Sequence, residues 1–355
     1  MCVKWPRRAL PPLLMQADPG PLVSVLLPFH NAADTIGDCI DSILAQTLAD
    51  FEVIAVNDFS DDDSLHVLQD YGDDRIKLVD NEHRGLVSAL NTGLAYCASP
   101  LVARMDADDI MYPNRLLKQY EYMRSHHDVV LLATRARKFP EATIRNGYRE
   151  YMRWQNSVLS NEDIHNQIYI ESPFAHPSVM FRRDSVIAAG AYRHGAFPED
   201  YELWLRLLHM GHRMEKLAEV LLDWRESEQR LSRVSDNYSR DAFDRIRADY
   251  LSRDKRIHNK RIAFWGAGRK TRQRARHLLD KGYEPAAWID IDPKKIGNRI
   301  NGIEVVEPAW LEQSIVDGDK PFVLNYVTNH GARDITRHYL QRIGYVMGKH
   351  YLEVG

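Results

Sequence analysis

Apolar runs alternate with amphipathic stretches through the first hundred residues of the chain. The run PLVSVLLPF, at residues 21–29, is continuously apolar, which is typical of a strand buried on both faces of a parallel sheet. Similar runs predict further strands, and the stretches between them carry the helical spacing or the capping residues of helices. The expected strands cover residues 21–29, 51–58, 75–80 and 100–109, and the expected helices cover residues 34–48, 60–72 and 86–98. This alternation predicts a doubly wound α/β sheet, in which ligands bind beyond the carboxyl ends of the strands.

The pattern loosens after residue 110 and restarts near residue 260. In the looser part, residues 177–181 predict a strand and residues 199–211 a helix. The densely and evenly charged residues 236–260 are expected to form an exposed linking helix. Strands and helices then alternate again. The predicted organisation is an N-terminal tail over 1–20, a larger α/β domain over 21–235, a charged linker helix over 236–259 and a smaller Rossmann-like α/β domain over 260–355.

The composition excludes several classes of protein. The chain has 355 residues, of which 44% are hydrophobic and 27% charged, so about two domains of roughly 150 residues each are expected. A net charge of -3 gives no global basic field, so no nucleic acid is expected as a partner. No apolar run approaches the ~18 residues that a membrane-spanning helix needs. We therefore expect a cytoplasmic protein, and peripheral contact at the inner membrane face is left open.

The cysteines and the N-terminus fit this expectation. Cys2, Cys39 and Cys97 form no CxxC pair, and an odd, sparse count is typical of unpaired cysteines in a reducing compartment. Residues 1–15 combine basic residues with a short apolar patch that two prolines break, so they make a poor signal peptide. We expect a frayed tail, and contact with an anionic membrane surface is the alternative.

Three carboxylates crowd into four positions at the end of the fourth expected strand. In ARMDADDI, residues 103–110, an extended backbone would point Asp106 and Asp108 the same way and Asp109 away. Two carboxylates side by side are costly unless a cation lies between them or one is protonated. A hard divalent ion such as Mg²⁺ or Mn²⁺ suits oxygen ligands and leaves positions open for phosphate oxygens. A polar loop in which Asp108 or Asp109 caps a helix is the alternative.

Five segments, in this order, give the acids a context. They are VSVLLPFHNA (23–32), VNDFSDDDS (56–64), HRGLVSALNTGL (83–94), RMDADD (104–109) and FPEDYELWLRL (197–207). Together they closely resemble the family-two glycosyltransferases, which have the GT-A fold, a doubly wound mixed sheet. The resemblance covers about residues 21–235. It implies a metal-dependent transfer of a sugar from a nucleotide-sugar donor, expected to be a UDP-sugar, to a hydroxyl of a glycan or lipid-linked acceptor.

The same resemblance assigns roles to single residues. Asp106 and Asp108 would hold Mn²⁺ or Mg²⁺ on the donor diphosphate, with Asp108 the more direct ligand. Asp200 would be the general base, with Glu199 as the fallback, and one base opposite a leaving group implies inversion at the anomeric carbon. The donor site implied by the resemblance comprises Pro28, His30, Asn31, Asp58, Gly85, Leu86, Asp106, Asp108, His176 and Arg225.

Several of these residues also admit purely structural roles. Glu199 and Asp200 could simply begin a helix, where acids complement the helix dipole. His176 could be a buried histidine held by the backbone. Arg225 could pair with Glu226 or Glu228 instead of phosphate oxygens, and Trp224 could pack in the core instead of stacking on a sugar or base. These alternatives stay open at the level of the sequence.

The C-terminal region raises a separate question. In FWGAGRKTR, residues 264–272, Gly266 and Gly268 fit a dinucleotide fingerprint between a strand and a helix, but Thr271 stands where the third glycine belongs. Asp290 lies about where a ribose-binding acid is expected. A Rossmann-like module without a cofactor and one that binds an NAD-type dinucleotide are both consistent with this match. The alternative functions are therefore an NAD-dependent oxidoreductase and a non-catalytic nucleotide-sugar binder.

Overall fold

The larger sheet is built on the predicted parallel strands. The computed structural model describes residues 20–144, 146–227, 230, 233 and 235–355, so the predicted tail, with Cys2, lies almost wholly outside the described residues. Within them the larger sheet has eight strands in the order β3-β2-β1-β4-β7-β6-β8-β5. β7 runs antiparallel to β4 and β6, and β5 antiparallel to β8, so the sheet is mixed. The strands are β1 (Val23–Phe29), β2 (Phe51–Asn57), β3 (Ile76–Asp80), β4 (Leu101–Arg104), β5 (Ile110–Met111), β6 (Val129–Phe139), β7 (Met180–Arg182) and β8 (Arg213–Arg225).

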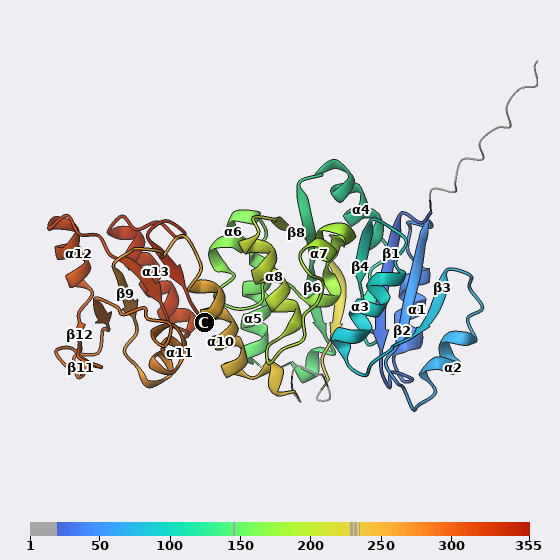
Figure 1. Cartoon of the computed structure of the whole chain (residues 1–355), viewed down its shortest axis with the longest axis horizontal. Coiled ribbons are helices and arrows are strands. Elements are labelled where there is room, and N and C mark those ends of the chain that lie inside the picture. Colours follow the sequence, from blue (N-terminus) through green and yellow to red (C-terminus); the bar gives the residue numbers. More distant parts are fainter. Residues whose placement is uncertain (1–19, 145, 228–229, 231–232, 234) are drawn as a thin grey trace, which may run out of the picture.

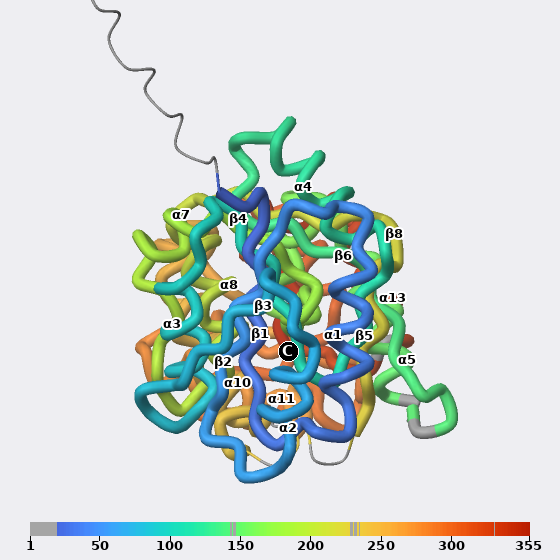
Figure 2. Tube along the Cα trace, turned by 90° about the vertical axis from the view of Figure 1, so that its right-hand side faces the viewer, coloured from blue at the N-terminus to red at the C-terminus, as the bar shows by residue number. Residues whose placement is uncertain are grey.

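Helices cover both faces of this sheet, which explains the continuously apolar strands. Figure 2 shows α1 and α3 on opposite sides of β1 and β2. Leu26 of β1 belongs to the core on the α3 side, and its neighbours Val25 and Leu27 to the core on the α1 side. The helices and helical turns around the sheet are α1 (Ile36–Leu44), α2 (Ser64–Gln69), α3 (Leu86–Tyr96), α4 (Arg115–Ser125), η1 (Glu141–Thr143), α5 (Asn146–Ser157), α6 (Asn161–Gln167), η2 (His176–Ser178), α7 (Arg183–Ala188) and α8 (Glu199–His209).

A second sheet forms in the C-terminal part of the chain. Its described strands follow the order β11-β12-β10-β9-β13-β14, and β9, β10, β12, β13 and β14 are parallel. This confirms the predicted second sheet. The elements are β9 (Ile262–Trp265), α11 (Arg269–Leu279), β10 (Ala287–Ile289), β11 (Arg299–Ile300), β12 (Ile303–Val306), α12 (Ala309–Val316), β13 (Phe322–Asn325), α13 (His330–Arg342) and β14 (Tyr351–Glu353).

The charged segment between the two sheets is a buried connector, so the prediction of an exposed linking helix was wrong. η3 (Asp236–Tyr238) leads into α10 (Arg240–Leu251), which packs between α8 and α11 (Figure 1). Tyr250 and Leu251 are buried. The evenly spaced charges suggested exposure to solvent, but they form ion pairs within the protein. Asp244 lies 2.5 Å from Arg247 of the same helix and 3.6 Å from Arg274 of α11. One apolar core consequently runs from the larger sheet through α10 into the second sheet.

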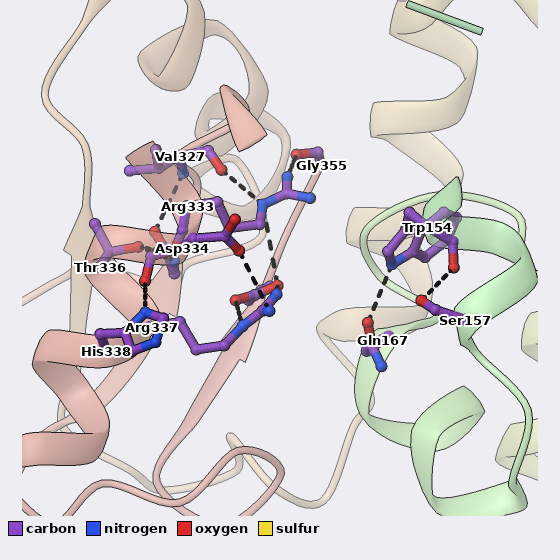
Figure 3. Close-up of polar contacts among 12 residues, drawn as sticks. Trp154, Ser157, Gln167, Val327, Arg333, Asp334, Thr336, Arg337, His338 and Gly355 are labelled. Atoms are coloured by element: carbon purple, nitrogen blue, oxygen red, sulfur yellow. Dashed lines mark hydrogen bonds and ion pairs between the residues drawn. The ribbon is translucent and has the colours of Figure 1, made fainter. Parts of the chain in front are cut away.

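The two sheets also meet beside the last strand. The Gly355 N–H donates to the Tyr169 carbonyl at 2.8 Å, and Arg333 Nη2 donates to the Gly355 carbonyl at 2.5 Å. Figure 3 shows this side next to the α5–α6 side, where Trp154 Nε1 donates to Gln167 Oε1 at 3.0 Å. A groove of about 420 Å³ lies between α6 and the end of α13. Among the helices that the structure describes, none has both the length and the apolar character needed to cross a bilayer.

Two small features support the packing of the larger sheet. Cys39 and Cys97 are buried and unpaired, as expected. Gly93 of α3 lies so close to the sheet that a Cβ placed there would be 2.2 Å from the Leu26 side chain and 2.8 Å from that of Val56. Only glycine permits this approach, so α3 sits directly on β1 and β2 and fixes the position of the loop before it.

Candidate active site

The acids after β4 form one cluster rather than a pair. The strand ends at Arg104, and the chain then turns at residues 107–108, so the backbone is not extended as expected. Carboxylate oxygens of Asp106, Asp108 and Asp109 all lie within 4.8 Å of one another. The expectation that Asp109 points away was therefore wrong, because a turn, unlike a strand, does not alternate its side chains between two faces. Asp109 is instead the fully buried member of the cluster.

The electrostatics of this cluster favour a bound cation. Burial, together with the charge of the neighbouring acids, raises the pKa of Asp108 and raises that of Asp109 more strongly. Asp109 Oδ1 accepts the Arg225 N–H at 2.7 Å, whereas the buried Oδ2 has no hydrogen-bond partner among the described residues. Three converging carboxylates, one with an unsatisfied buried oxygen, are the donor set that a hard divalent ion prefers. The residues thus fit Mg²⁺ or Mn²⁺.

A buried arginine connects this cluster with a second pair of acids. Arg104 is 2% exposed and forms an ion pair with Asp106. Its positive charge also lowers the pKa of Glu199 and Asp200 against the larger, opposing effect of their burial. The acids after β4 and those at the start of α8 therefore share one electrostatic environment.

Glu199 and Asp200 occupy the first turn of α8 but differ in their contacts. Glu199 Oε2 accepts from the Tyr238 hydroxyl at 2.5 Å, and its Oε1 lies 3.7 Å from His176 Nδ1. Asp200 Oδ1 accepts the N–H of Tyr201 at 2.7 Å. Burial, and next the charge of Glu199, raise the pKa of Asp200 to about 8. Glu199 is buried whereas Asp200 is half-buried, so Asp200 is the more accessible of the two acids. Both residues also begin a helix, as the structural alternative holds.

His176 is buried beside Glu199. Its Nε2 lies 2.9 Å from the Tyr192 hydroxyl, and its ring meets Trp204 edge-on at 5.8 Å between centroids. Burial, and next the charge of Arg104, lower the pKa of His176 well below its usual value, so the ring is neutral. Its described polar contacts are thus to side chains, not to the backbone as the structural alternative expected. Whether His176 also contacts a donor stays a prediction.

Arg225 holds the acidic turn in place. Its Nε donates to the Asp108 carbonyl at 2.6 Å, its backbone N–H donates to Asp109, and its Nη2 lies 3.5 Å from Asp38 Oδ2. The alternative pairing with Glu226 does not occur, because Glu226 forms ion pairs with Lys138 and other cations. Glu228, the other glutamate of that alternative, lies outside the described residues. Arg225 therefore reaches the acidic turn after β4 and fixes its backbone. Its contact with a donor phosphate stays a prediction.

Trp224 lies beside a group of cations that the sequence did not single out. Lys138 Nζ and Arg230 Cζ are each 4.4 Å from the centre of a Trp224 ring. The charge of Arg230 also lowers the pKa of Asp108 and Asp109, so this arginine lies close to the acidic turn. Positive charge thus stands next to the acids, where a donor diphosphate would require it.

The loops after β1 and β2 complete the same edge of the sheet. β1 pairs in parallel with both β2 and β4, so their carboxyl ends are neighbours. Asp58 accepts the Gly85 N–H at 2.8 Å and an Asn81 amide hydrogen at 2.7 Å. Asn31, in a left-handed conformation with φ 47°, exchanges hydrogen bonds with Asp61 at 2.6 and 2.9 Å. Asp58 and Asn31 therefore shape the two loops predicted to bind the nucleotide.

The other predicted donor-site residues differ in exposure. His30 is exposed at the end of β1, whereas Pro28 is buried within that strand and pairs with Val56. Gly85 adopts φ 123°, a conformation that other residues rarely adopt, and Leu86 begins α3 and is half-buried. His30 and Gly85 are thus accessible, while Pro28 is not, and the roles of all four residues in donor binding stay predictions.

Two supporting residues escaped the sequence analysis. Tyr238 lies in the segment that was read as an exposed linker, and only its aromatic character among charged residues hinted at a buried role. Arg104 stands in the recognised RMDADD segment, but a strand-end arginine gives no sign in the sequence that it is buried. Contacts between elements distant along the chain decide both positions.

The C-terminal glycine turn is occupied by its own chain. Asp290 accepts the N–H groups of Ala267 and Asp292 at 2.8 and 3.0 Å, and Lys295 Nζ lies 3.1 Å away. A Cβ at Gly266 would lie 2.9 Å from Thr271 Oγ1, so threonine fills the space below the turn. The acid expected to bind ribose is therefore engaged by protein groups, and these contacts give the dinucleotide interpretation no support.

Comparison with known proteins places these observations in context. The model of the family described as "Glycosyl transferase family 2" matches residues 24–190. The amylovoran biosynthesis glycosyltransferase AmsE of Erwinia amylovora is 38% identical over 206 residues, which cover 57% of this chain and 75% of that protein. A UDP-Gal:alpha-D-GlcNAc-diphosphoundecaprenol beta-1,3-galactosyltransferase of Escherichia coli is 29% identical over 222 residues, which cover 61% of this chain and 78% of that protein.

A solved structure supports the fold. TarS 1-349 of S. aureus, crystallised with UDP-GlcNAc, aligns with a TM-score of 0.53 at 16% identity. The alignment covers 72% of this chain and 71% of that one. The predicted GT-A architecture is thereby confirmed.

Proposed function

The chain belongs to glycosyl transferase family 2, and from this premise we propose that it transfers a sugar from a UDP-sugar donor to a hydroxyl of a glycan or lipid-linked acceptor, with inversion. The main support for the proposal is that two groups of acids, each suited to a different task, lie at the same edge of the sheet. The cluster of Asp106, Asp108 and Asp109 fits a cation, while Asp200 has a raised pKa and is only half-buried. The name of the E. coli relative, which gives a UDP-Gal donor and a diphosphoundecaprenol-linked acceptor, supports the choice of substrates.

The residues divide the reaction between them. Asp106, Asp108 and Asp109 would hold Mn²⁺ or Mg²⁺, and the ion would supply positive charge that neutralises the leaving diphosphate. Asp200 accepts the proton of the acceptor hydroxyl as its oxygen attacks the anomeric carbon and the bond to the donor phosphate breaks. Attack from the side opposite the leaving group inverts the configuration. Arg225 keeps the metal-binding turn in position, and Tyr238 holds Glu199 beside the base.

Ligand-induced thermal stabilisation tests this function against its alternatives. UDP together with Mn²⁺ is expected to raise the melting temperature, and NAD is not. Asp108→Ala should abolish the effect of UDP with Mn²⁺, whereas Asp200→Asn should keep it and lose sugar transfer. Stabilisation by NAD alone would favour the oxidoreductase. Metal-dependent UDP binding without donor hydrolysis or transfer over a panel of donors and acceptors would favour the non-catalytic binder.

A further inference from the structure

One helix of the second sheet carries uncompensated positive charge. α11 buries Ala275 and Leu278 and presents Arg269, Lys270 and Arg272 to solvent. In the part of the chain that the structure describes, none of these three cations has an ion-pair partner within 4.0 Å. Two other basic residues of α11, Arg274 and His277, face α10 and lie beside the acids Asp244 and Asp241 of α10. Among the described residues, no nearby acid therefore neutralises the positive charges of Arg269, Lys270 and Arg272 on the outer face of α11.

An exposed apolar side chain lies on the same edge. β9 and β10 are parallel neighbours, so the start of α11 after β9 and Ile291 after β10 lie at the same carboxyl edge. A hydrogen bond of 2.8 Å from the Ala267 N–H to Asp290 ties the two loops together. Ile291 is 68% exposed, so most of its aliphatic side chain is open to contact from outside. Cations and an apolar side chain are therefore presented together.

This edge and the proposed active site lie on one side of the molecule. In Figure 1, α11 lies along the lower side of the view, as does α2, which follows the carboxyl end of β2. Figure 2, turned about the vertical, shows both helices low again. A flat surface that meets α11 from below would thus extend beneath the ends of β1 and β2, where the donor site is proposed.

We propose that the outer face of α11 (Arg269, Lys270, Arg272), together with Ile291, docks on the surface of an anionic lipid bilayer. Each cation near such a surface strengthens binding by a factor of about five, and the factors multiply. Ile291 adds apolar area that can enter the headgroup region. The choice of a bilayer as partner rests on the proposed function, because a lipid-linked acceptor lies in a membrane.

Vesicle co-sedimentation of the full chain tests the proposal. The vesicles contain phosphatidylcholine alone or in equal parts with phosphatidylglycerol. Arg269→Glu/Arg272→Glu removes two cations of the face. Lys260→Glu/Lys349→Glu is the charge-matched control, because both lysines are exposed and precede β9 and β14 at the opposite, amino edge of the same sheet. The wild-type chain should bind only anionic vesicles, and more weakly at high salt.

Vesicle binding of the variants is compared with that of the wild-type chain. Arg269→Glu/Arg272→Glu should weaken vesicle binding at least about 25-fold, the control far less, and Ile291→Ser a few-fold. Equal losses in both double variants, or equal binding to neutral vesicles, would overturn the proposal, as would binding of RNA without binding of vesicles. Sugar transfer to a water-soluble acceptor is measured in parallel. Docking without any transfer would refute the proposed function alone, and transfer without docking would refute this inference alone.

Discussion

Asp200 is expected to govern the pH dependence of sugar transfer. A general base acts only when deprotonated, and burial beside Glu199 raises the pKa of Asp200 to about 8. Below that pH the deprotonated fraction falls tenfold per pH unit. At pH 7 it is about one tenth, so kcat/KM is expected to lie about tenfold below its plateau, and at pH 6 about a hundredfold below. Rates should rise as the pH increases and level off above about pH 8.

Initial rates at low acceptor concentration, with metal and donor saturating at every pH, provide the measurement. The Asp200→Asn variant is the control: its residual activity should be lower by roughly 10²–10⁴ and should lack the inflection near pH 8. Glu199→Gln tests the origin of the shift, because removal of the neighbouring charge should move the inflection to lower pH. A wild-type profile that is flat from pH 6 to pH 9, or an Asp200→Asn enzyme that keeps the inflection, would refute the assignment of the base.

Three further outcomes follow from single contacts. Tyr238→Phe removes the hydrogen bond that stabilises ionised Glu199, so Glu199 keeps its proton more readily. A neutral Glu199 no longer raises the pKa of Asp200, so the inflection of the pH–rate profile should move to lower pH. A move to higher pH would contradict this reasoning. Asp108→Asn should lower Mn²⁺ affinity, measured by titration calorimetry, at least about tenfold, since even residues behind metal ligands cost about 10–100-fold; unchanged affinity would remove it from the site. Gly93→Ala puts a methyl group 2.2 Å from a leucine of β1 and should reduce the free energy of unfolding by about 1–3 kcal/mol in urea denaturation, whereas Gly147→Ala, with open space around it, should not destabilise.

The strands of the larger sheet were predictable because their burial leaves a direct trace in the sequence. Residues 23–29 and 51–57 face helices on both sides, so nearly every position is apolar whatever the rest of the fold does. The ends of the strands were equally visible, since polar residues begin where the sheet stops. Parallel pairing of β1 with β2 and β4 then brings those ends together, as the predicted ligand edge required.

The linking segment shows where such reasoning fails. An evenly charged helix is expected to be solvated, but α10 places its charges against the complementary charges of α11 and buries its aliphatic residues. The same segment delivers the Tyr238 hydroxyl to Glu199. Hydrophobic pattern alone cannot reveal this, because the partners of buried charges lie on elements far away along the chain.

For this chain, the order of apolar runs and the residue types at their ends were enough to predict the sheet, the edge at which a ligand is expected and the acids at that edge. The tertiary structure alone decided the surroundings of each acid. Asp109 joins the cluster because the chain turns after β4, and Asp200 gains its raised pKa because α8 begins in a buried place beside Glu199. Sequence records the chemical groups, but the reactivity of a carboxylate depends on its desolvation and on neighbouring charges, which exist only once distant segments have packed.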